Sequence, residues 1–306
     1  MQHATMEMRY YMAIVIAVLA FSCGPGTKKD GSSTTKKTEG METSLQMQQA
    51  TSKDGTLIGY WKSGAGPSLL LVHGTTADHS RWAPILPRLE KDFTVYAMDR
   101  RGRGGSGDGP QYDIMREAED VAAVVEAIGG PVCVLGHSYG AVCSLEAALL
   151  TDKVRRLVLY EPPIPTHIAM YPPKAPDRIQ ALVDGKKLEE GLEVFFREVV
   201  KMPEAELTAY RQLPVWKVRV QLAPTISREL AIDRKYVFEP AKFSGLHVPT
   251  LLLLGGDSPP LFQQAMKRLG PALPNSRVAI LPGQQHIAMD TAPDLFIKEV
   301  TQFLTE

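Results

Sequence analysis

The sequence has no excess of charge of either sign and few cysteines. Its 34 basic and 34 acidic residues cancel, so the chain lacks the positive surface that attracts nucleic acid. Its three cysteines and seven histidines show neither the C-x-x-C nor the H-E-x-x-H spacing of a zinc site. We therefore expect no nucleic-acid partner and no bound metal.

Nucleotide-binding motifs and internal repeats are also missing. No G-x-G-x-x-G motif opens a first βαβ unit, and there is no Walker-type phosphate loop. The chain is nevertheless long enough for a large core, because 44% of its 306 residues are hydrophobic. We expect a globular protein without a cofactor.

The N-terminus carries a short apolar run, Tyr10 to Phe21, with Arg9 before it. A membrane-spanning helix needs about 20 apolar residues, so this run is too short to span a bilayer. A basic residue, a short apolar core and a small residue form a secretory signal. The stretch from Leu19 to Cys23 resembles the lipobox of bacterial lipoproteins, in which the cysteine is lipidated and becomes the mature N-terminus.

The resemblance to a lipobox is imperfect, because Ala20 and Phe21 depart from the usual residues. An ordinary cleaved signal with an incidental cysteine is the alternative. Residues 24–47 are rich in Gly, Ser, Thr and Lys, as in a solvated tether. The sequence thus predicts a signal peptide at 1–23, a flexible linker at 24–47 and an exported protein. Its lipid would anchor it to a bacterial membrane, facing the periplasm or the cell exterior.

The folded domain is expected at residues 48–306, where short apolar runs alternate with helical patterns. Alternation at this spacing indicates a mostly parallel sheet covered by helices on both faces. The predicted strands are Gln48 to Ser52, Thr56 to Trp61, Ser68 to Val72, Phe93 to Met98, Val132 to Leu135, Val154 to Tyr160, Thr250 to Leu254 and Val278 to Leu281. The predicted core helices are Arg81 to Leu89, Met115 to Ala127, Ala141 to Leu150 and Asp294 to Leu304.

Residues 162–248 interrupt this alternation after the sixth strand. A connection of this length is rarely a bare loop, so we expect a small helical cap there. Apolar residues recur at helical spacing from Leu188 to Val200, and Pro203 to Leu213 and Pro224 to Lys235 are further helix candidates.

A G-x-S-x-G pattern, Gly136 to Gly140, lies between an apolar strand and a helix-forming run. This order is the signature of a nucleophile elbow, in which the serine occupies a strained turn and the glycines allow close packing. Ser138 is therefore the candidate nucleophile. A serine hydroxyl needs a base to remove its proton and a carboxylate to orient that base.

Functional groups of a parallel sheet gather at the carboxyl ends of its strands. Asp257 follows the seventh predicted strand and His286 follows the eighth, so Ser138, Asp257 and His286 occur in the order serine, acid, histidine. His286 is the expected base and Asp257 the expected acid. Glu161, after the sixth strand, is the alternative acid.

The chain from about Gln48 to Glu306 resembles the α/β-hydrolase fold superfamily. The resemblance rests on His73-Gly74, on the segment from Asp99 to Ser106, on the G-x-S-x-G pattern, and on Asp257, His286 and Pro293. It implies an eight-stranded sheet and an oxyanion hole formed by the amides of Thr75 and Tyr139. The serine nucleophile argues against haloalkane dehalogenase and epoxide hydrolase chemistry, because those relatives use an aspartate at the elbow.

The resemblance implies a serine hydrolase, and a carboxylic ester cleaved through an acyl-enzyme is the first expectation. Carbon–carbon bond hydrolysis, lactone opening and perhydrolysis use similar triads and stay open, as does a module that only binds a small molecule. The sequence shows no cluster of like charge that would hold a phosphate or carboxylate, which favours a small neutral acyl group. Cap aromatic residues such as Phe195, Phe196 and Trp216 either line the pocket or form the cap's own core.

We expect several other residues to have structural roles. We expect His73 to orient the oxyanion loop, His137 to pack beside the elbow, and Asp290 to cap or bond nearby backbone. Arg100, Arg101 and Arg103 are expected to form ion pairs in a solvated loop. Cys133 and Cys143, on the strand and helix that flank the elbow, are expected to be buried free thiols.

Lipidation of Cys23 is testable by fractionation. If Cys23 is acylated, the protein should sediment with bacterial membranes, because several acyl chains anchor far more firmly than one. Cys23→Ala should release the protein or block its processing. Intact-mass spectrometry that finds an unmodified mature N-terminus beyond Cys23 would exclude the lipid anchor.

Overall fold

The computed structural model describes residues 45–306 except 203 and 234. The predicted signal peptide with Cys23, and nearly all of the predicted linker, lie outside the described residues. In the described part of the chain, no helix is both long and apolar enough to cross a membrane.

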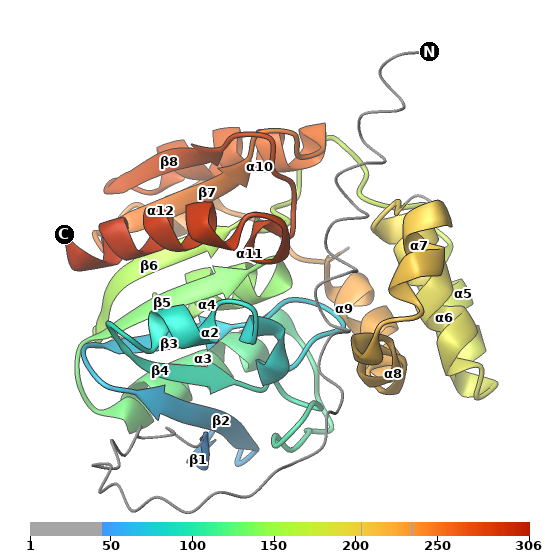
Figure 1. Ribbon diagram of the computed structural model, residues 1–306, viewed down its shortest axis with the longest axis horizontal. Helices are drawn as coiled ribbons and strands as arrows, with labels where there is room; N and C mark the ends of the chain where they lie inside the picture. The colour runs from blue at the N-terminus through green and yellow to red at the C-terminus, as the bar shows by residue number, and fades with distance from the viewer. Residues whose placement is uncertain (1–44, 203, 234) are drawn as a thin grey trace, which may run out of the picture. The chain divides into compact units, whose positions relative to one another are not determined.

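An eight-stranded sheet forms the centre of the domain (Figure 1). The first two strands pair antiparallel, the second pairs antiparallel with the fourth, and the remaining pairs are parallel. In spatial order the strands are β1 (Gln46–Thr51), β2 (Leu57–Gly64), β4 (Thr94–Met98), β3 (Ser68–Val72), β5 (Val132–His137), β6 (Val154–Tyr160), β7 (Thr250–Gly255) and β8 (Ser276–Leu281).

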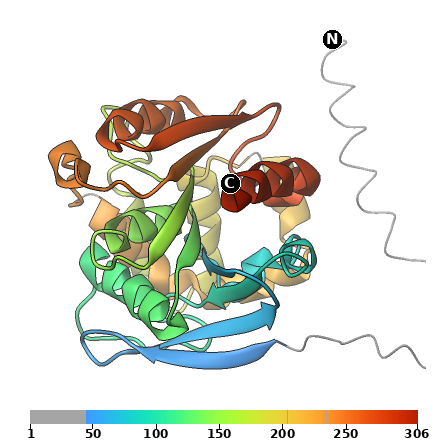
Figure 2. The same ribbon diagram turned by 90° about the vertical axis from the view of Figure 1, so that its left-hand side faces the viewer.

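Both faces of the sheet are covered by helices (Figure 2). Residues of α3 (Ile114–Ile128), α4 (Tyr139–Ala147) and α10 (Pro260–Leu269) belong to the core on one face. Residues of α2 (Leu86–Leu89), α11 (Ala288–Thr291) and α12 (Pro293–Thr305) belong to the core on the other. The continuous apolar runs of β3, β5 and β7 follow from this arrangement, because both of their faces are buried. The predicted α/β-hydrolase fold is confirmed.

The start and end of α3 show how local sequence sets a core helix. The Asp113 side chain accepts a hydrogen bond from the Arg116 amide (2.9 Å), which caps the first turn. Gly129 ends the helix with φ of 84°, a conformation that glycine adopts without strain. The helix predicted at Arg81 to Leu89 is instead a 3-10 turn, His79–Trp82, followed by the short α2. Pro84 and Pro87 lack the amide hydrogens that a continuous helix requires.

The segment between β6 and β7 forms a helical cap with a core of its own. Its helices are α5 (Ala175–Asp184), α6 (Leu188–Val194), a π-helical turn (Phe195–Val199), α7 (Glu204–Tyr210), α8 (Pro214–Gln221) and α9 (Ile226–Asp233). Phe195, Phe196 and Trp216 are buried in this core with Leu192, and Tyr210 packs against it. These aromatic side chains therefore belong to the interior of the cap.

Buried ion pairs join the cap to the sheet. Arg100 follows β4 and its guanidinium lies 2.7 Å from Glu117 on α3 and 2.7 Å from Glu229 on α9. Arg103 also pairs with Glu229, and Arg101 pairs with Asp120 on α3 at 2.6 Å. The expectation of a solvated arginine loop is wrong, because all three arginine side chains are fully buried. Their partners lie on helices far along the chain.

Burial alone would raise the pKa of Glu117, but the positive charges of Arg100 and Arg103 lower it to about 2. Glu117 is therefore ionised in the folded protein at neutral pH. The cluster consists of compensated charges, and removing one of its carboxylates leaves two buried cations with one anion between them.

Glu229→Gln tests this cluster. Neutralising Glu229 leaves Arg100 and Arg103 sharing Glu117, so we expect a loss of about 3 to 5 kcal/mol in the free energy of unfolding. Urea denaturation followed by circular dichroism measures it. The control is Glu190→Gln in the same cap, where the pair with Lys187 is exposed and the change should be small. Equal, small changes in both variants would contradict a stabilising role for the cluster.

Candidate active site

Ser138 occupies a strained turn between β5 and α4. Its backbone has φ of 56° and ψ of −126°, a conformation that a non-glycine residue seldom adopts. The turn is fixed by two backbone hydrogen bonds: the Ser138 amide donates to the Tyr160 carbonyl, and the Ala141 amide donates to the Ser138 carbonyl, both at 2.9 Å. Strained backbone held in this way is typical of functional sites.

The glycines on either side of Ser138 are required by close packing. A Cβ atom on Gly136 would lie 2.6 Å from the Cα of Ala141, and one on Gly140 would lie 2.3 Å from the His73 carbonyl oxygen. Neither position has room for a side chain. The elbow geometry thus follows from the sequence pattern.

His286 is held by Glu161. The Nδ1 atom of His286 lies 2.6 Å from Oε2 of Glu161, which is fully buried at the end of β6. The other carboxylate oxygen, Oε1, accepts hydrogen bonds from the Gly255 amide (2.8 Å) and from the Ser258 hydroxyl. Because an ionised carboxylate only accepts, His286 donates from Nδ1 and its Nε2 is left as the basic nitrogen.

This contact differs from the expected one, in which Asp257 orients His286. Asp257 is exposed, and its backbone amide donates to the Gln284 carbonyl (2.9 Å). Asp257 is nevertheless next in sequence to Ser258, whose hydroxyl bonds to Glu161. The parallel strands β6 and β7 are neighbours, so residues after either strand start from the same region of the sheet edge. Only Glu161 faces inward there, with a backbone φ of 47°.

The His286 loop is fixed from several sides. The Tyr160 hydroxyl donates to the Gln285 carbonyl and accepts from the Ala288 amide (3.0 Å). The His137 ring lies 4.6 Å from the His286 ring, and its Nε2 donates to the His286 carbonyl (2.9 Å). The Phe262 ring stacks on the His286 ring at 4.7 Å. Since His137 precedes Ser138, these contacts bring the histidine and the serine to one site.

The loop that carries Thr75 lies against the elbow. A Cβ atom added to Gly74 would come within 2.9 Å of the Ser138 Cβ, so glycine is needed for this approach. Thr75 itself is half-buried, and Tyr139 begins α4 directly after Ser138. The two predicted oxyanion residues therefore lie on the two backbone segments that meet at Ser138.

Two buried histidines beside the site are neutral. The Arg100 amide donates to Nε2 of His73 (3.1 Å), so Nδ1 of His73 donates to the Gly74 carbonyl (2.8 Å). Burial lowers the pKa of His73 to about 3. Burial, together with the charges of His286 and Arg81, lowers the pKa of His137 well below its usual value. Both side chains hold backbone in place, as the sequence suggested.

Two contacts of charged side chains near the site were not predicted from the sequence. Arg81 forms two hydrogen bonds to Asp290, one of 2.9 Å, so Asp290 pairs with a side chain and does not cap backbone as expected. Arg219, on cap helix α8, donates from Nη1 to the carbonyl oxygen (3.0 Å) and the hydroxyl of Thr76. No motif signals either contact, because the partners are distant in sequence.

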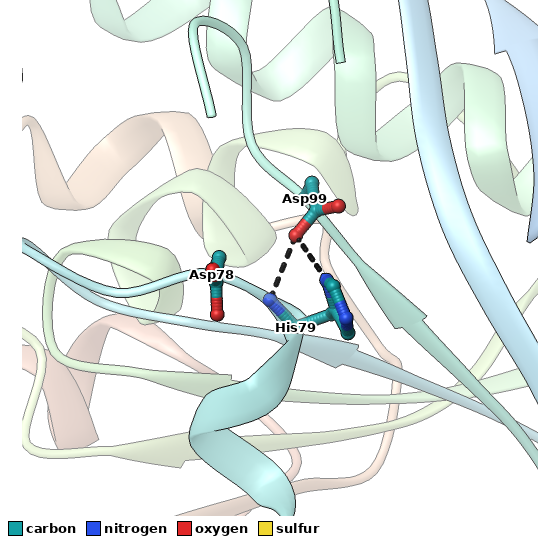
Figure 3. Close-up of side chains that lie close together, drawn as sticks. All are labelled: Asp78, His79 and Asp99. Atoms are coloured by element: carbon teal, nitrogen blue, oxygen red, sulfur yellow. Dashed lines mark hydrogen bonds and ion pairs between the residues drawn. The ribbon is translucent and has the colours of Figure 1, made fainter. Parts of the chain in front are cut away.

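The described residues contain one cluster that could hold a metal ion, Asp78, His79 and Asp99 (Figure 3). One oxygen of Asp99 accepts from the backbone and ring nitrogens of His79. The other accepts from the Trp61 ring (3.0 Å) and the Gly105 amide (2.9 Å). A metal would have to displace these donors, so the cluster fits a structural role that fixes the loop after β4. Cys133 and Cys143 are buried free thiols, as expected.

Comparison with known proteins also places the chain among the alpha/beta hydrolases. The model of the alpha/beta hydrolase family matches residues 69–299. The chain is similar to the 2-(acetamidomethylene)succinate hydrolase of Mesorhizobium japonicum, with 28% identity over 79% of this chain and 90% of that protein. It is also similar to the N-formylmaleamate deformylase of Pseudomonas putida, with 39% identity over 37% of this chain and 44% of that protein.

Among solved structures, the chain is similar to an alpha/beta hydrolase from Sphaerobacter thermophilus. The two share 34% sequence identity with a TM-score of 0.76, over 84% of this chain and all of the other.

The acid can be identified by two matched substitutions. Glu161→Gln keeps the side-chain size but favours the wrong imidazole tautomer of His286, so hydrolysis of p-nitrophenyl acetate should fall by about 10³- to 10⁴-fold. Asp257→Asn makes the same chemical change on an exposed carboxylate and should retain most activity. A larger loss in Asp257→Asn than in Glu161→Gln would return the acid to Asp257.

Proposed function

This chain belongs to the alpha/beta hydrolase family, and on that premise we propose that it is a serine hydrolase that cleaves a carboxylic ester with a small acyl group. Ser138 is the nucleophile, His286 the base and Glu161 the residue that orients His286. The observation that carries this proposal is the 2.6 Å hydrogen bond between His286 and the buried Glu161, on a loop that also contacts the elbow.

The first half of the reaction forms an acyl-enzyme. Nε2 of His286 takes the proton of the Ser138 hydroxyl as the oxygen attacks the ester carbonyl. The resulting oxyanion is stabilised by the amides of Tyr139 and Thr75, and the N-terminus of α4 adds a favourable dipole. His286 then returns the proton to the departing alcohol as the carbon–oxygen bond breaks.

The second half releases the acid. Water attacks the acyl-enzyme while His286 removes one of its protons, and the tetrahedral intermediate collapses with return of that proton to Ser138. Glu161 stabilises the imidazolium that forms in each half. Its three hydrogen bonds keep it from rotating away from His286.

A second candidate substrate is an N-acyl compound. The names of the two curated relatives contain an acetamido group and an N-formyl group. The same nucleophile, base and oxyanion donors act on an amide carbonyl, with His286 protonating a departing nitrogen in place of an oxygen. Both names describe small acyl groups, and the ester proposed above also has a small acyl group.

We also propose that the enzyme acts in an exported compartment, attached to a bacterial membrane through lipid on Cys23. The support is the order of Arg9, the apolar run to Phe21 and Cys23, followed by a polar linker. A tether of that composition leaves the catalytic domain free of the membrane surface.

A series of p-nitrophenyl esters tests the acyl preference. We expect the C2 and C4 esters to be cleaved best and activity to fall gradually towards C8 and C16, because apolar pockets discriminate weakly, by about 1 to 3 kcal/mol per methylene. A fluorophosphonate probe should label Ser138 and abolish turnover. A C16 optimum, or a rate jump above substrate solubility, would indicate a lipase. Saturable ester binding without turnover would indicate a binding module.

A further inference from the structure

Arg219 is a cap residue that contacts the loop after β3, which also lies against the elbow. Its helix, α8, belongs to the cap, which lies at the end of the sheet towards which the parallel strands point (Figure 1). Its guanidinium is bonded to Thr76, the neighbour of the oxyanion residue Thr75. Its charge also acts on His137, whose ring is 4.6 Å from that of His286. A cation therefore lies close to the reacting groups.

The charge of Arg219 is only weakly compensated, since the one carboxylate that acts on it, Asp290, is paired with Arg81. Among the side chains that the structure describes, no carboxylate forms an ion pair with it. The groups that it contacts are neutral: Thr76, and the rings of Tyr210 and Phe196, whose centroids lie 5.5 and 5.7 Å from its Cζ. Its Nε is buried without a hydrogen-bond partner. By contrast, Arg81 near the same site is neutralised by Asp290.

Such an arrangement is costly unless an anion completes it. An arginine keeps its charge at all ordinary pH values, and removing that charge from water without a counterion is unfavourable. Arg219 is partly buried, and this burial lowers the pKa of its guanidinium. A guanidinium offers several donors in one plane, which match the two oxygens of a carboxylate.

We propose that Arg219 binds a carboxylate of the substrate, so that the enzyme prefers an anionic ester or N-acyl compound over a neutral one. One weakly compensated positive charge matches one carboxylate better than a doubly charged phosphate. The bonds to Thr76 and the flanking rings hold the guanidinium beside the oxyanion loop. This inference rests on the proposed function, and it replaces the neutral substrate expected from sequence.

The test compares anionic esters with neutral esters of similar size. The phenyl hemiester of glutaric acid, with its carboxylate on the acyl side, is paired with phenyl hexanoate. The compound 4-acetoxybenzoate, with its carboxylate on the leaving group, is paired with phenyl acetate. We expect the wild-type enzyme to prefer one of the anionic esters. The pair that shows the preference identifies the side on which the carboxylate binds.

Arg219→Gln should lower kcat/KM for that anionic ester by about 10- to 100-fold, mainly through KM, and should affect its neutral partner far less. Arg219→Lys keeps the charge and should recover part of the loss. The control is Arg211→Gln, also on the cap, whose arginine is exposed and pairs with Glu193 and Glu189. It should leave both rates unchanged.

A binding measurement separates this inference from the proposed function. Calorimetric titration of both anionic esters into Ser138→Ala needs no turnover, and adding Arg219→Gln should weaken the binding of the preferred one about tenfold or more. If the wild type cleaves no ester but this difference persists, the proposed function fails and the anion site stands. Equal losses for anionic and neutral esters, or no preference in the wild type, would overturn the anion site.

Discussion

The buried carboxylate of Glu161 is the constraint on which the site depends. It accepts hydrogen bonds from the backbone after β7, from Ser258 and from His286, so one anion joins three segments at the edge of the sheet. A buried carboxylate must be satisfied in this way, because an unpaired charge in the interior is prohibitively costly. The same bonds that stabilise Glu161 in the core orient the histidine. The stability of the sheet edge and the orientation of His286 therefore come from one group.

Charged side chains also connect the cap to the rest of the domain, in two different ways. Glu229 on α9 completes a buried cluster with Arg100 and Arg103, in which positive and negative groups compensate one another. Arg219 on α8 bonds to the oxyanion loop but meets only neutral partners among the described side chains. The first contact attaches the cap, whereas the second brings a cation without an ion-pair partner among the described side chains to the loop that carries Thr76. We regard this asymmetry as the main clue to substrate choice.

The carboxylate that contacts His286 shows what strand order alone cannot decide. Asp257 and Glu161 both follow apolar strands, and β6 and β7 are neighbours, so strand order alone allows either carboxylate to approach the His286 loop. The choice depends on backbone direction after the strand. Glu161 turns inward with φ of 47°, whereas Asp257 stays exposed. The prediction of a solvated loop for the arginines after β4 was wrong for a similar reason. Their partners on α3 and α9 are 17 to 129 residues away in the sequence.

The sequence by itself determined the order of strands and helices, the strained turn at Ser138 and the position of His286 after the last strand. These features depend on local patterns: buried runs between turn residues, glycines that permit close packing, and a serine between them. Only the tertiary structure decided that Glu161 orients His286, that the cap aromatics face the cap's own core, and that Arg219 lies at the oxyanion loop. Those contacts join residues far apart in the chain, and a side chain's direction there is set by the packing of whole elements, which no local pattern contains.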